Sequence, residues 1–261
     1  MKKVSTLLVS GIIILSSCQK NDQYLDADFT KEKPDKHTKA NAVIKKCSIV
    51  QLTYFVADGS SDVLQFVYNS SGDPVSITRS SGPHTGYPNY SFKYDQKKRL
   101  TDFIGVYDGN PNAEFWHKYF YDNQDHIIMD STYIFPRVTN GFPENAFDKR
   151  LTYYTYDKDG RIIKDSTVSL SNSSVNTYVY NADGNLVGRT YDNNNNVNRT
   201  NEIWMFLNKD YSVNNPFTAD AYNTSALPSS LNLPEESGFG FLGNFYSKAQ
   251  LVYSCDDTTA K

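Results

Sequence analysis

Residues that could do chemistry are few in this 261-residue sequence, and their spacing matches no catalytic or metal-binding motif. The four histidines are His37, His84, His117 and His126, and no two of them have the spacing of metal ligands. The patterns G-x-S-x-G and H-E-x-x-H do not occur. Glu114 and His117 are close in sequence, but positions three apart on a strand face opposite sides of a sheet. We therefore expect no catalytic residue, no metal, no cofactor and no enzymatic activity.

Two short motifs resemble the beginning of ligand sites. Asp157, Asp159 and Gly160 start like a calcium-binding loop, but Val168 stands where such a loop needs a bidentate glutamate. Residues 238–243 fit G-x-G-x-x-G, but a proline-rich stretch precedes them and too few residues follow for a dinucleotide-binding unit. We interpret both as turns, the second one allowing neighbouring phenylalanines to pack.

The N-terminus predicts export and lipid attachment. Two lysines precede an apolar run over 7–15, which is about half the ~20 residues that a membrane-spanning helix needs. The sequence LSSC at 15–18 resembles the bacterial lipobox, which implies cleavage before Cys18 and acylation of that cysteine. This interpretation makes 1–17 a signal peptide and places the protein at the outer membrane. A secreted protein with an incidental cysteine is the alternative.

Residues 18–46 predict a flexible, lipidated tether, because they are rich in lysine, aspartate and threonine and show little apolar periodicity. Lys20-Asn21-Asp22 partly resembles the signal that sends some Gram-negative lipoproteins to the cell surface. Both a periplasm-facing and a surface-exposed orientation therefore stay open. Cys47 and Cys255 then remain as an even pair in an oxidising compartment, which predicts a disulfide across the domain. Two buried free thiols are the alternative.

Composition excludes other classes of protein. The net charge is −3, and loss of the signal peptide removes two lysines and no acidic residue, which leaves −5. Without a block of basic residues, we expect no nucleic-acid partner. Aromatic residues make up 14% of the chain, which is unlike a disordered protein or a helical bundle.

A degenerate internal repeat predicts the fold. Tyr68, Tyr94, Tyr121, Tyr156 and Tyr180 each end an aromatic run and precede Asp or Asn, and the clearest copies read YDKDGRI and YNADGNL. An Asp-Gly pair between strand-forming residues predicts a β-hairpin. Lys98 and Asp125 replace the turn glycine in two copies, which predicts different turns there.

Together these hairpins predict a single all-β domain over 47–257, followed by a short tail over 258–261. Further strands are expected at 47–56, 202–207 and 245–254, a long loop at 231–243 and short helical turns at 219–227. We expect an antiparallel meander that forms a strongly curved sheet or a partly closed β-barrel, because twist accumulates in a long sheet.

The repeat copies resemble the YD, or Rhs, repeats of bacterial surface and toxin-delivery proteins. Over 47–255 the chain looks closer to a family of Gram-negative lipoproteins of unknown function that combine such repeats with a porin-like, open-barrel fold. By analogy with half-barrel lipoproteins, the resemblance implies a lipid or acyl chain bound in the concave face.

The surplus of aromatic residues is the main clue to function. Tyrosine and tryptophan combine a large apolar ring with a polar tip, which suits a lipid-lined cavity and also the stacking of sugar rings. We therefore predict a non-enzymatic, outer-membrane-anchored lipoprotein that binds a lipid or other apolar ligand. The alternatives are a surface glycan-binding or adhesion module and a structural component of an envelope complex. The candidate contact residues are Trp116, Tyr119, Tyr121, Tyr154 and Trp204.

Overall fold

The computed structural model describes residues 47–55, 59–234 and 238–255, which belong to one unit spanning 38–261. The predicted signal peptide, Cys18, the tether over 18–46 and the tail over 258–261 lie outside these residues. The part of the chain that is described contains no helix whose length and apolar character would suit a membrane span.

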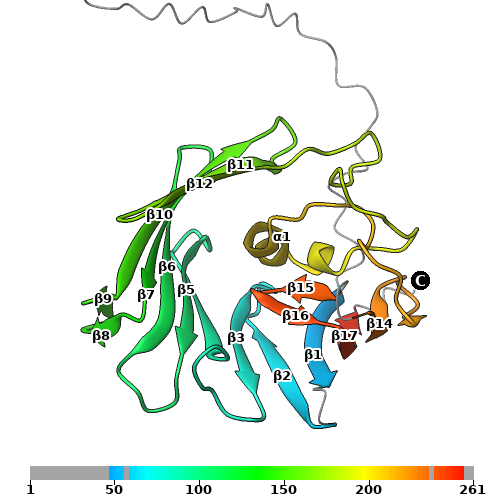
Figure 1. Cartoon of the computed structure of the whole chain (residues 1–261), viewed down its shortest axis with the longest axis horizontal. Helices are drawn as coiled ribbons and strands as arrows, with labels where there is room; N and C mark the ends of the chain where they lie inside the picture. The colour runs from blue at the N-terminus through cyan, green and yellow to red at the C-terminus, as the bar shows by residue number, and fades with distance from the viewer. Residues whose placement is uncertain (1–46, 56–58, 235–237, 256–261) are drawn as a thin grey trace, which may run out of the picture. The chain divides into compact units, whose positions relative to one another are not determined.

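One antiparallel sheet of thirteen strands dominates the domain. Its strands are β1 (Cys47–Phe55), β2 (Ser61–Tyr68), β3 (Pro74–Arg79), β4 (Asn89–Tyr94), β5 (Leu100–Val106), β6 (Ala113–Tyr121), β7 (Ile127–Ile134), β10 (Asp148–Tyr156), β11 (Ile162–Ser169), β12 (Ser173–Thr177), β13 (Ala221–Tyr222), β14 (Pro228–Asn232) and β17 (Lys248–Cys255). Their order is β12-β11-β10-β7-β6-β5-β4-β3-β2-β1-β17-β14-β13. The sheet curves around a short helix, α1 (Glu202–Asn208), so that one face is concave (Figure 1). The predicted all-β antiparallel meander is confirmed, as an open sheet that ends at β12 and β13.

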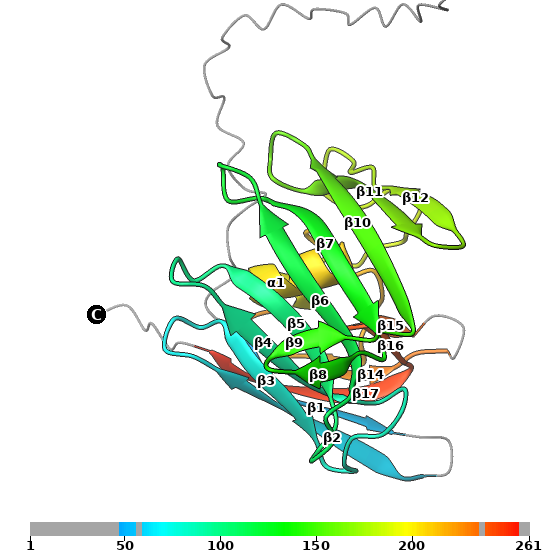
Figure 2. The same cartoon turned by 90° about the vertical axis from the view of Figure 1, so that its left-hand side faces the viewer.

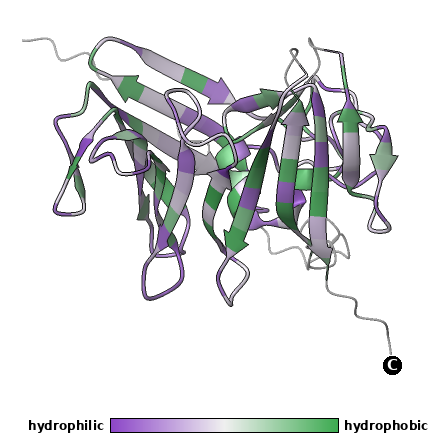
Figure 3. Cartoon of the chain, turned by 90° about the horizontal axis from the view of Figure 1, so that it is seen from below, coloured by the Kyte–Doolittle hydropathy of each residue, from purple (hydrophilic) through white to green (hydrophobic). Residues whose placement is uncertain are grey.

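Side chains along the strands alternate between the two faces. In β2, Leu64 and Phe66 are buried on the concave side, whereas Gln65 and Val67 are exposed. Figure 3 shows the resulting alternation of apolar and polar residues along several strands. This period of two directs the apolar side chains of the meander to one core.

Three short elements fill the centre of the concave face. They are the 3-10 helix η1 (Val197–Thr200), α1, and a hairpin of β15 (Phe239–Phe241) and β16 (Asn244–Tyr246). Trp204 of α1 is fully buried, and the centroid of its ring lies 5.9, 5.7 and 5.5 Å from those of Phe66, Phe92 and Phe241. The core therefore joins the sheet to α1 and to the β15–β16 hairpin.

The prediction of a strand at 202–207 is wrong, because these residues form α1. The side-chain oxygen of Asn201 accepts a hydrogen bond from the Ile203 N–H at 2.9 Å, which caps the start of the helix. Lys209 ends the helix with a φ of 51°. Residues 203–207 are all apolar, so periodicity alone could not separate a buried helix from a buried strand.

Two other expectations for the C-terminal stretch are also wrong. Residues 219–227, expected to form short helical turns, contain β13 and a strand-connecting turn. Residues 231–243, expected to form a loop, contain the end of β14 and all of β15. Short strands with proline at one boundary, such as Pro228, are hard to distinguish from loops in a sequence.

Six copies of one turn lie at the same end of the antiparallel sheet. We number each copy from its tyrosine as position 1. The side-chain oxygen of Asp or Asn at position 2 accepts hydrogen bonds from the N–H groups of positions 4 and 6. The residue at position 5 has a positive φ of 55° to 86°. The copies begin at Tyr68, Tyr94, Tyr121, Tyr156, Tyr180 and Tyr222.

The copies at Tyr94 and Tyr121 use the same turn as the others, which corrects the prediction of different turns. Lys98 and Asp125 occupy position 5 with φ of 65° and 62°, so the hydrogen bonds to position 2 hold a non-glycine residue in the left-handed region. The sixth copy, at Tyr222, has Ala226 at this position with φ of 55°. It escaped the sequence analysis because it lacks both the aspartate and the glycine.

The repeat tyrosines connect successive copies. The hydroxyls of Tyr94, Tyr121 and Tyr156 each donate a hydrogen bond to the backbone carbonyl at position 7 of the preceding copy, where that copy's second strand begins. The pairs are Tyr94 with Pro74 (2.7 Å), Tyr121 with Leu100 (2.7 Å) and Tyr156 with Ile127 (2.8 Å), and Tyr253 of β17 contacts Pro228 in the same way (2.7 Å). We call this contact the tyrosine staple. It satisfies a buried carbonyl and fixes one hairpin against the next.

A disulfide joins the two ends of the domain. Cys47 of β1 and Cys255 of β17 are paired residues of adjacent strands, with Cα atoms 4.0 Å apart and a sequence separation of 208. The bond links the first and last strands of the described chain. It stabilises the fold because it reduces the conformational entropy of the unfolded chain.

The tyrosine staple predicts that Tyr94→Phe destabilises the domain. The change deletes one hydroxyl and leaves the Pro74 carbonyl without its partner, which should lower the free energy of unfolding by about 1–2 kcal/mol. Tyr153→Phe is the control, because this ring is 47% exposed on the opposite face of the sheet. Urea denaturation should separate the two variants, and equal stabilities would contradict the staple.

The turn geometry predicts that Gly160→Ala lowers the free energy of unfolding by about 1 kcal/mol, because alanine is strained at a positive φ. Gly160 has a φ of 74°, and a Cβ built there meets no atom within 4 Å, so backbone strain is the sole cost. Gly240→Ala is the matched control, because Gly240 lacks a positive φ and its Cβ would make only an ordinary van der Waals contact, at 4.0 Å from the Asn244 carbonyl oxygen. Stability measurements on both variants check this, and a neutral Gly160→Ala would show that the turn tolerates side chains without strain.

Candidate functional site

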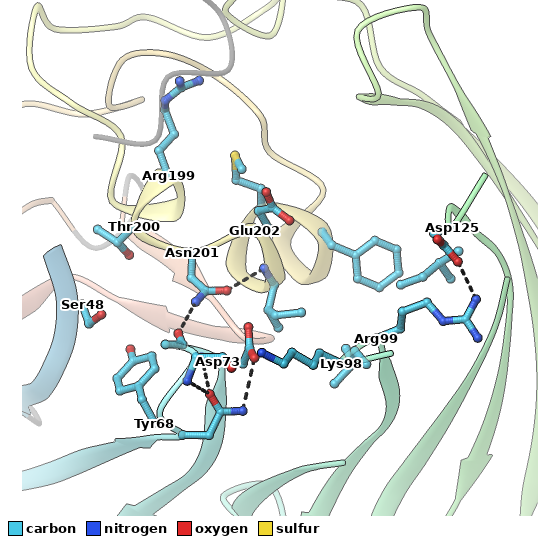
Figure 4. Close-up of a pocket in the computed structure, with 18 of the residues that line it drawn as sticks. Ser48, Tyr68, Asp73, Lys98, Arg99, Asp125, Arg199, Thr200, Asn201 and Glu202 are labelled. Carbon is cyan, nitrogen blue, oxygen red and sulfur yellow. Dashed lines mark hydrogen bonds and ion pairs between the residues drawn. The ribbon is translucent and has the colours of Figure 1, made fainter. Parts of the chain in front are cut away.

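A groove of about 950 Å³ opens at the end of the sheet where the repeat turns gather. Turn residues of the β2–β3, β4–β5, β6–β7 and β10–β11 hairpins line one side, and residues from η1 and α1 line the other. Figure 4 shows Arg99 and Asp125 on the sheet side of the groove, with Thr200, Asn201 and Glu202 across from them. The geometry of the groove therefore depends on the turns and on the position of α1.

The lining of the groove is mixed, with nearly as much polar as apolar surface, and apolar side chains form its base. Leu100, Ile127 and Phe206 are buried, with exposed fractions of 2%, 8% and 8%. Ile203 and Met205 extend this surface along α1. The remaining apolar area comes from the rings of the repeat tyrosines and of one further tyrosine, namely Tyr68, Tyr121, Tyr156 and Tyr211.

The tyrosine rings contribute apolar surface because their hydroxyls are already used. Tyr68 donates to the carbonyl of Ile49 at 2.8 Å, and the staples occupy the hydroxyls of Tyr121 and Tyr156. Burial raises the pKa of all three tyrosines well above the ordinary value near 10. They are therefore neutral over the physiological range.

The rim of the groove carries charges of both signs. Arg99 Nη2 and Nη1 lie 2.7 Å from the carboxylates of Asp95 and Asp125, and the hydrogen bonds that Arg99 donates to these two groups raise its pKa. The acidic residues along the groove are Asp73, Asp125, Asp159 and Glu202, and the basic ones are Lys98, Arg99 and Arg199. Such a rim suits a zwitterionic or polar head better than a simple anion or cation.

Residues at position 6 cover the tyrosine rings of the next copy. The guanidinium of Arg99 lies 4.5 Å from the centroid of the Tyr121 ring, and His126 stacks on Tyr156 with centroids 5.2 Å apart. Arg161 lies over Tyr180 in the same way, at 4.4 Å. Each contact occupies one face of a ring, which leaves at most the other face open for stacking.

Asn201 fixes the distance between the two sides of the groove. Its Nδ2 donates to the Gly72 carbonyl at 3.0 Å, in the first repeat turn, while its Oδ1 caps α1. This one side chain ties the start of the helix to the sheet. Sequence reasoning missed it because 202–207 were expected to form a strand, although the Asn-Glu-Ile start is a signal for a capped helix.

Four of the five predicted contact aromatics lie on the inner side of the sheet. Tyr121 lines the groove. Tyr119 and Tyr154 lie deeper, each 5.3 Å from the ring of Phe206, and Trp204 is buried in the core. The structure thus places Tyr119 and Tyr154 beneath the groove, against Phe206, and Tyr121 is the one predicted contact aromatic that borders the groove directly.

Trp116 lies on the opposite, convex face. Its Nε1 donates to Asp102 at 2.6 Å, and Lys93 Nζ lies 4.6 Å from the centre of its ring. A small hairpin, β8 (Arg137–Thr139) and β9 (Phe142–Glu144), covers this face, and Val138 packs on Trp116 (Figure 2). Trp116 is 2% exposed and separated from the groove by the sheet.

A polar cluster on the concave face does not form a catalytic triad. His117 Nδ1 lies 2.7 Å from Asp130 and 3.0 Å from the Thr132 hydroxyl, so one ring nitrogen serves both groups. A triad needs the acid and the hydroxyl on opposite nitrogens. The described residues also contain no group of three or more His, Cys, Asp or Glu that could hold a metal ion.

The two short motifs are structural turns in the described chain. Asp157 accepts backbone hydrogen bonds from Asp159 and Arg161, as position 2 of a repeat. Residues 238–243 belong to the β15–β16 hairpin, in which Phe239 and Phe241 are buried. Phe245, expected to pack with them, is 60% exposed.

The raised pKa values of the groove tyrosines predict alkaline unfolding. In the unfolded chain these groups ionise near pH 10, whereas in the folded chain they stay protonated, so the unfolded state binds fewer protons above pH 10. The free energy of unfolding should be level below pH 10 and fall by about 1.4 kcal/mol per pH unit for each such tyrosine above it. Absorbance at 295 nm and circular dichroism should then change together, whereas ionisation with an intact fold would contradict this.

No family model matches this chain, and no curated protein matches it. Among solved structures it is similar to the crystal structure of TcdB2-TccC3-Cdc42, with 14% identity and a TM-score of 0.29, over 52% of this chain and 8% of that chain. The crystal structure of TcdB2-TccC3-TEV gives the same identity and TM-score over 72% of this chain and 10% of that one. The chain thus spans no more than 10% of the length of either structure.

Proposed function

We propose that this protein is a non-enzymatic lipoprotein of the outer membrane that binds an amphipathic lipid in the groove between its repeat turns and α1. The proposal combines the lipobox-like sequence ending at Cys18 and the resemblance to Gram-negative lipoproteins with the geometry of the groove. Acylated Cys18 anchors the chain, and residues 18–46 hold the domain away from the membrane.

The observation that carries the proposal is a groove with an apolar base and a charged rim. Its volume of about 950 Å³ lies at the upper end of the range of about 300–1,000 Å³ that is typical of small-molecule sites. The apolar side chains of Leu100, Ile127 and Met205 offer contacts for a hydrocarbon chain. The mixed charges of the rim offer partners for a polar headgroup.

We propose that the ligand lies in this groove only, because side chains of the core occupy the rest of the concave face. Trp204 and Phe241 fill the centre of that face and are fully buried there. Ser48 of β1 and Ser254 of β17 both line the groove, so the start of the described domain lies beside it. A tether that ends at residue 46 would join the domain at the edge of the groove, which favours a ligand drawn from the membrane.

The groove geometry favours a lipid over a glycan. Sugar rings stack on open aromatic faces, but Arg99 and His126 already cover the rings of Tyr121 and Tyr156. A hydrocarbon chain requires no such platform, because it needs only apolar surface.

The test uses residues 19–261, which lack only the signal peptide and Cys18, exported to a periplasm so that Cys47 and Cys255 can oxidise. Native mass spectrometry with solvent extraction should find a bound lipid on the parent protein. Met205→Glu should reduce binding by about tenfold or more, because it buries a carboxylate in the apolar part of the groove. Met205 lies outside the main core cluster, so this variant should fold.

Val168→Glu is the matched control, because Val168 is a 47% exposed apolar residue of β11 outside the groove. It should bind lipid like the parent. A parent protein without extractable lipid, or lipid binding that Met205→Glu leaves unchanged, would refute the proposed function.

A further inference from the structure

Two charged side chains of the groove have no partner within the described chain. Lys98 of the β4–β5 turn and Glu202 of α1 line the groove from opposite sides (Figure 4). Neither side chain forms an ion pair or a hydrogen bond with another described residue. By contrast, Arg99 and Asp125 of the same rim lie 2.7 Å apart and neutralise each other. The groove therefore offers one positive and one negative charge to a ligand.

Lys98 occupies a position that favours glycine. It is position 5 of its repeat turn, with a φ of 65°, and three other copies have Gly72, Gly160 and Gly184 there. A side chain in this left-handed region carries a conformational cost that glycine avoids. A strained residue that brings a charge to the edge of a groove indicates a role in binding.

Glu202 lies beside a hydroxyl that is also available to a ligand. Tyr211 lines the groove, and among the four groove tyrosines its hydroxyl alone makes no hydrogen bond within the described residues. Burial raises the pKa of Tyr211 well above its ordinary value, and Glu202 is one of the nearby charges that raise it further. The Tyr211 hydroxyl therefore stays protonated and can donate to an anionic oxygen, while Glu202 can accept from a cation.

We propose that the groove selects lipids with a zwitterionic headgroup, in which a phosphate binds Lys98 and a primary ammonium binds Glu202. This inference rests on the proposed function and names the headgroup that the groove recognises. The opposite charges on the two sides of the groove match the two charges of such a headgroup. A headgroup with a single charge would leave either Lys98 or Glu202 without a partner.

Glu202 favours a primary ammonium over a quaternary one. A primary ammonium donates charge-assisted hydrogen bonds to a carboxylate, whereas a quaternary ammonium has no N–H group and is bound by cages of aromatic faces. Two of the four groove tyrosines already have one ring face covered, by Arg99 and His126. The groove therefore suits a phosphoethanolamine headgroup better than a phosphocholine headgroup.

The test uses delipidated residues 19–261 and short-chain lipids that differ only in the headgroup, with affinity measured by isothermal titration calorimetry. Phosphatidylethanolamine should bind about fivefold more tightly than phosphatidylglycerol or phosphatidylcholine, which corresponds to one solvent-exposed charge pair. Free phosphoethanolamine should bind more weakly than the lipid, because it lacks the acyl chains.

Two variants separate the two contacts. Glu202→Gln should remove the preference for phosphatidylethanolamine over phosphatidylglycerol. Lys98→Gly should weaken the binding of both lipids by about fivefold and keep the stability of the parent, because glycine is unstrained at this φ. Lys164→Gln and Glu144→Gln are the matched controls, because these exposed residues of β11 and β9 lie outside the groove. Both controls should bind every lipid like the parent.

Equal affinities for the three lipids would overturn the inference and leave the proposed function standing. A preference for phosphatidylethanolamine that survives both variants would have the same meaning. Free phosphoethanolamine that binds as tightly as the lipid would contradict the proposed function, because the acyl chains would then contribute nothing. Failure to bind any of the three lipids would contradict both.

Discussion

The hydroxyl of a half-buried tyrosine, donated to the backbone of the preceding repeat, holds successive hairpins of this sheet together at their turns. Ladder hydrogen bonds set the register of neighbouring strands from one hairpin to the next. The staples from Tyr94, Tyr121 and Tyr156 add a side-chain contact at the turn end, because each one binds the first carbonyl of a strand in the copy before it. A tyrosine hydroxyl that is buried without an acceptor loses the hydrogen bond that it makes to water in the unfolded chain. The staple supplies an acceptor, so the ring can pack against the core without that loss.

The same residues help to curve the sheet. In four hairpins the register shifts at position 1, at Tyr68, Tyr94, Tyr121 and Tyr156. Such bulges bend a strand and increase its twist, and four of them at equivalent places add up to a curved sheet. The curved sheet surrounds α1, and the repeat turns form a row along one end of the sheet, next to this helix. The groove is therefore a consequence of the repeat, with Asn201 setting its width.

The repeat explains why much of the fold was predictable. A tyrosine followed by Asp or Asn, with a glycine in three of the copies, identified five hairpins, and their succession indicated a meander. Ala226 shows the limit, because its copy keeps the turn hydrogen bonds without the glycine. The helix α1 was missed because an all-apolar run has no periodicity to read, and its cap at Asn201 was the only local signal.

The candidate site was less predictable than the fold. Aromatic residues were selected by type, but the side of the sheet that each one faces depends on register. One consequence is that Trp116 lies on the convex face, next to Asp102. The apolar base of the groove is formed by residues such as Ile127, Ile203 and Met205, which are ordinary in sequence and meet only when the turns and α1 come together.

The most direct test of this account is a crystal structure of residues 19–261 purified from an exported source without solvent extraction. We predict electron density for a chain-like molecule lying against Leu100, Ile127 and Met205, with its polar end at the rim near Arg99 and Asp125. A groove closed by the protein's own side chains, or a lipid bound elsewhere while the groove is empty, would contradict the account.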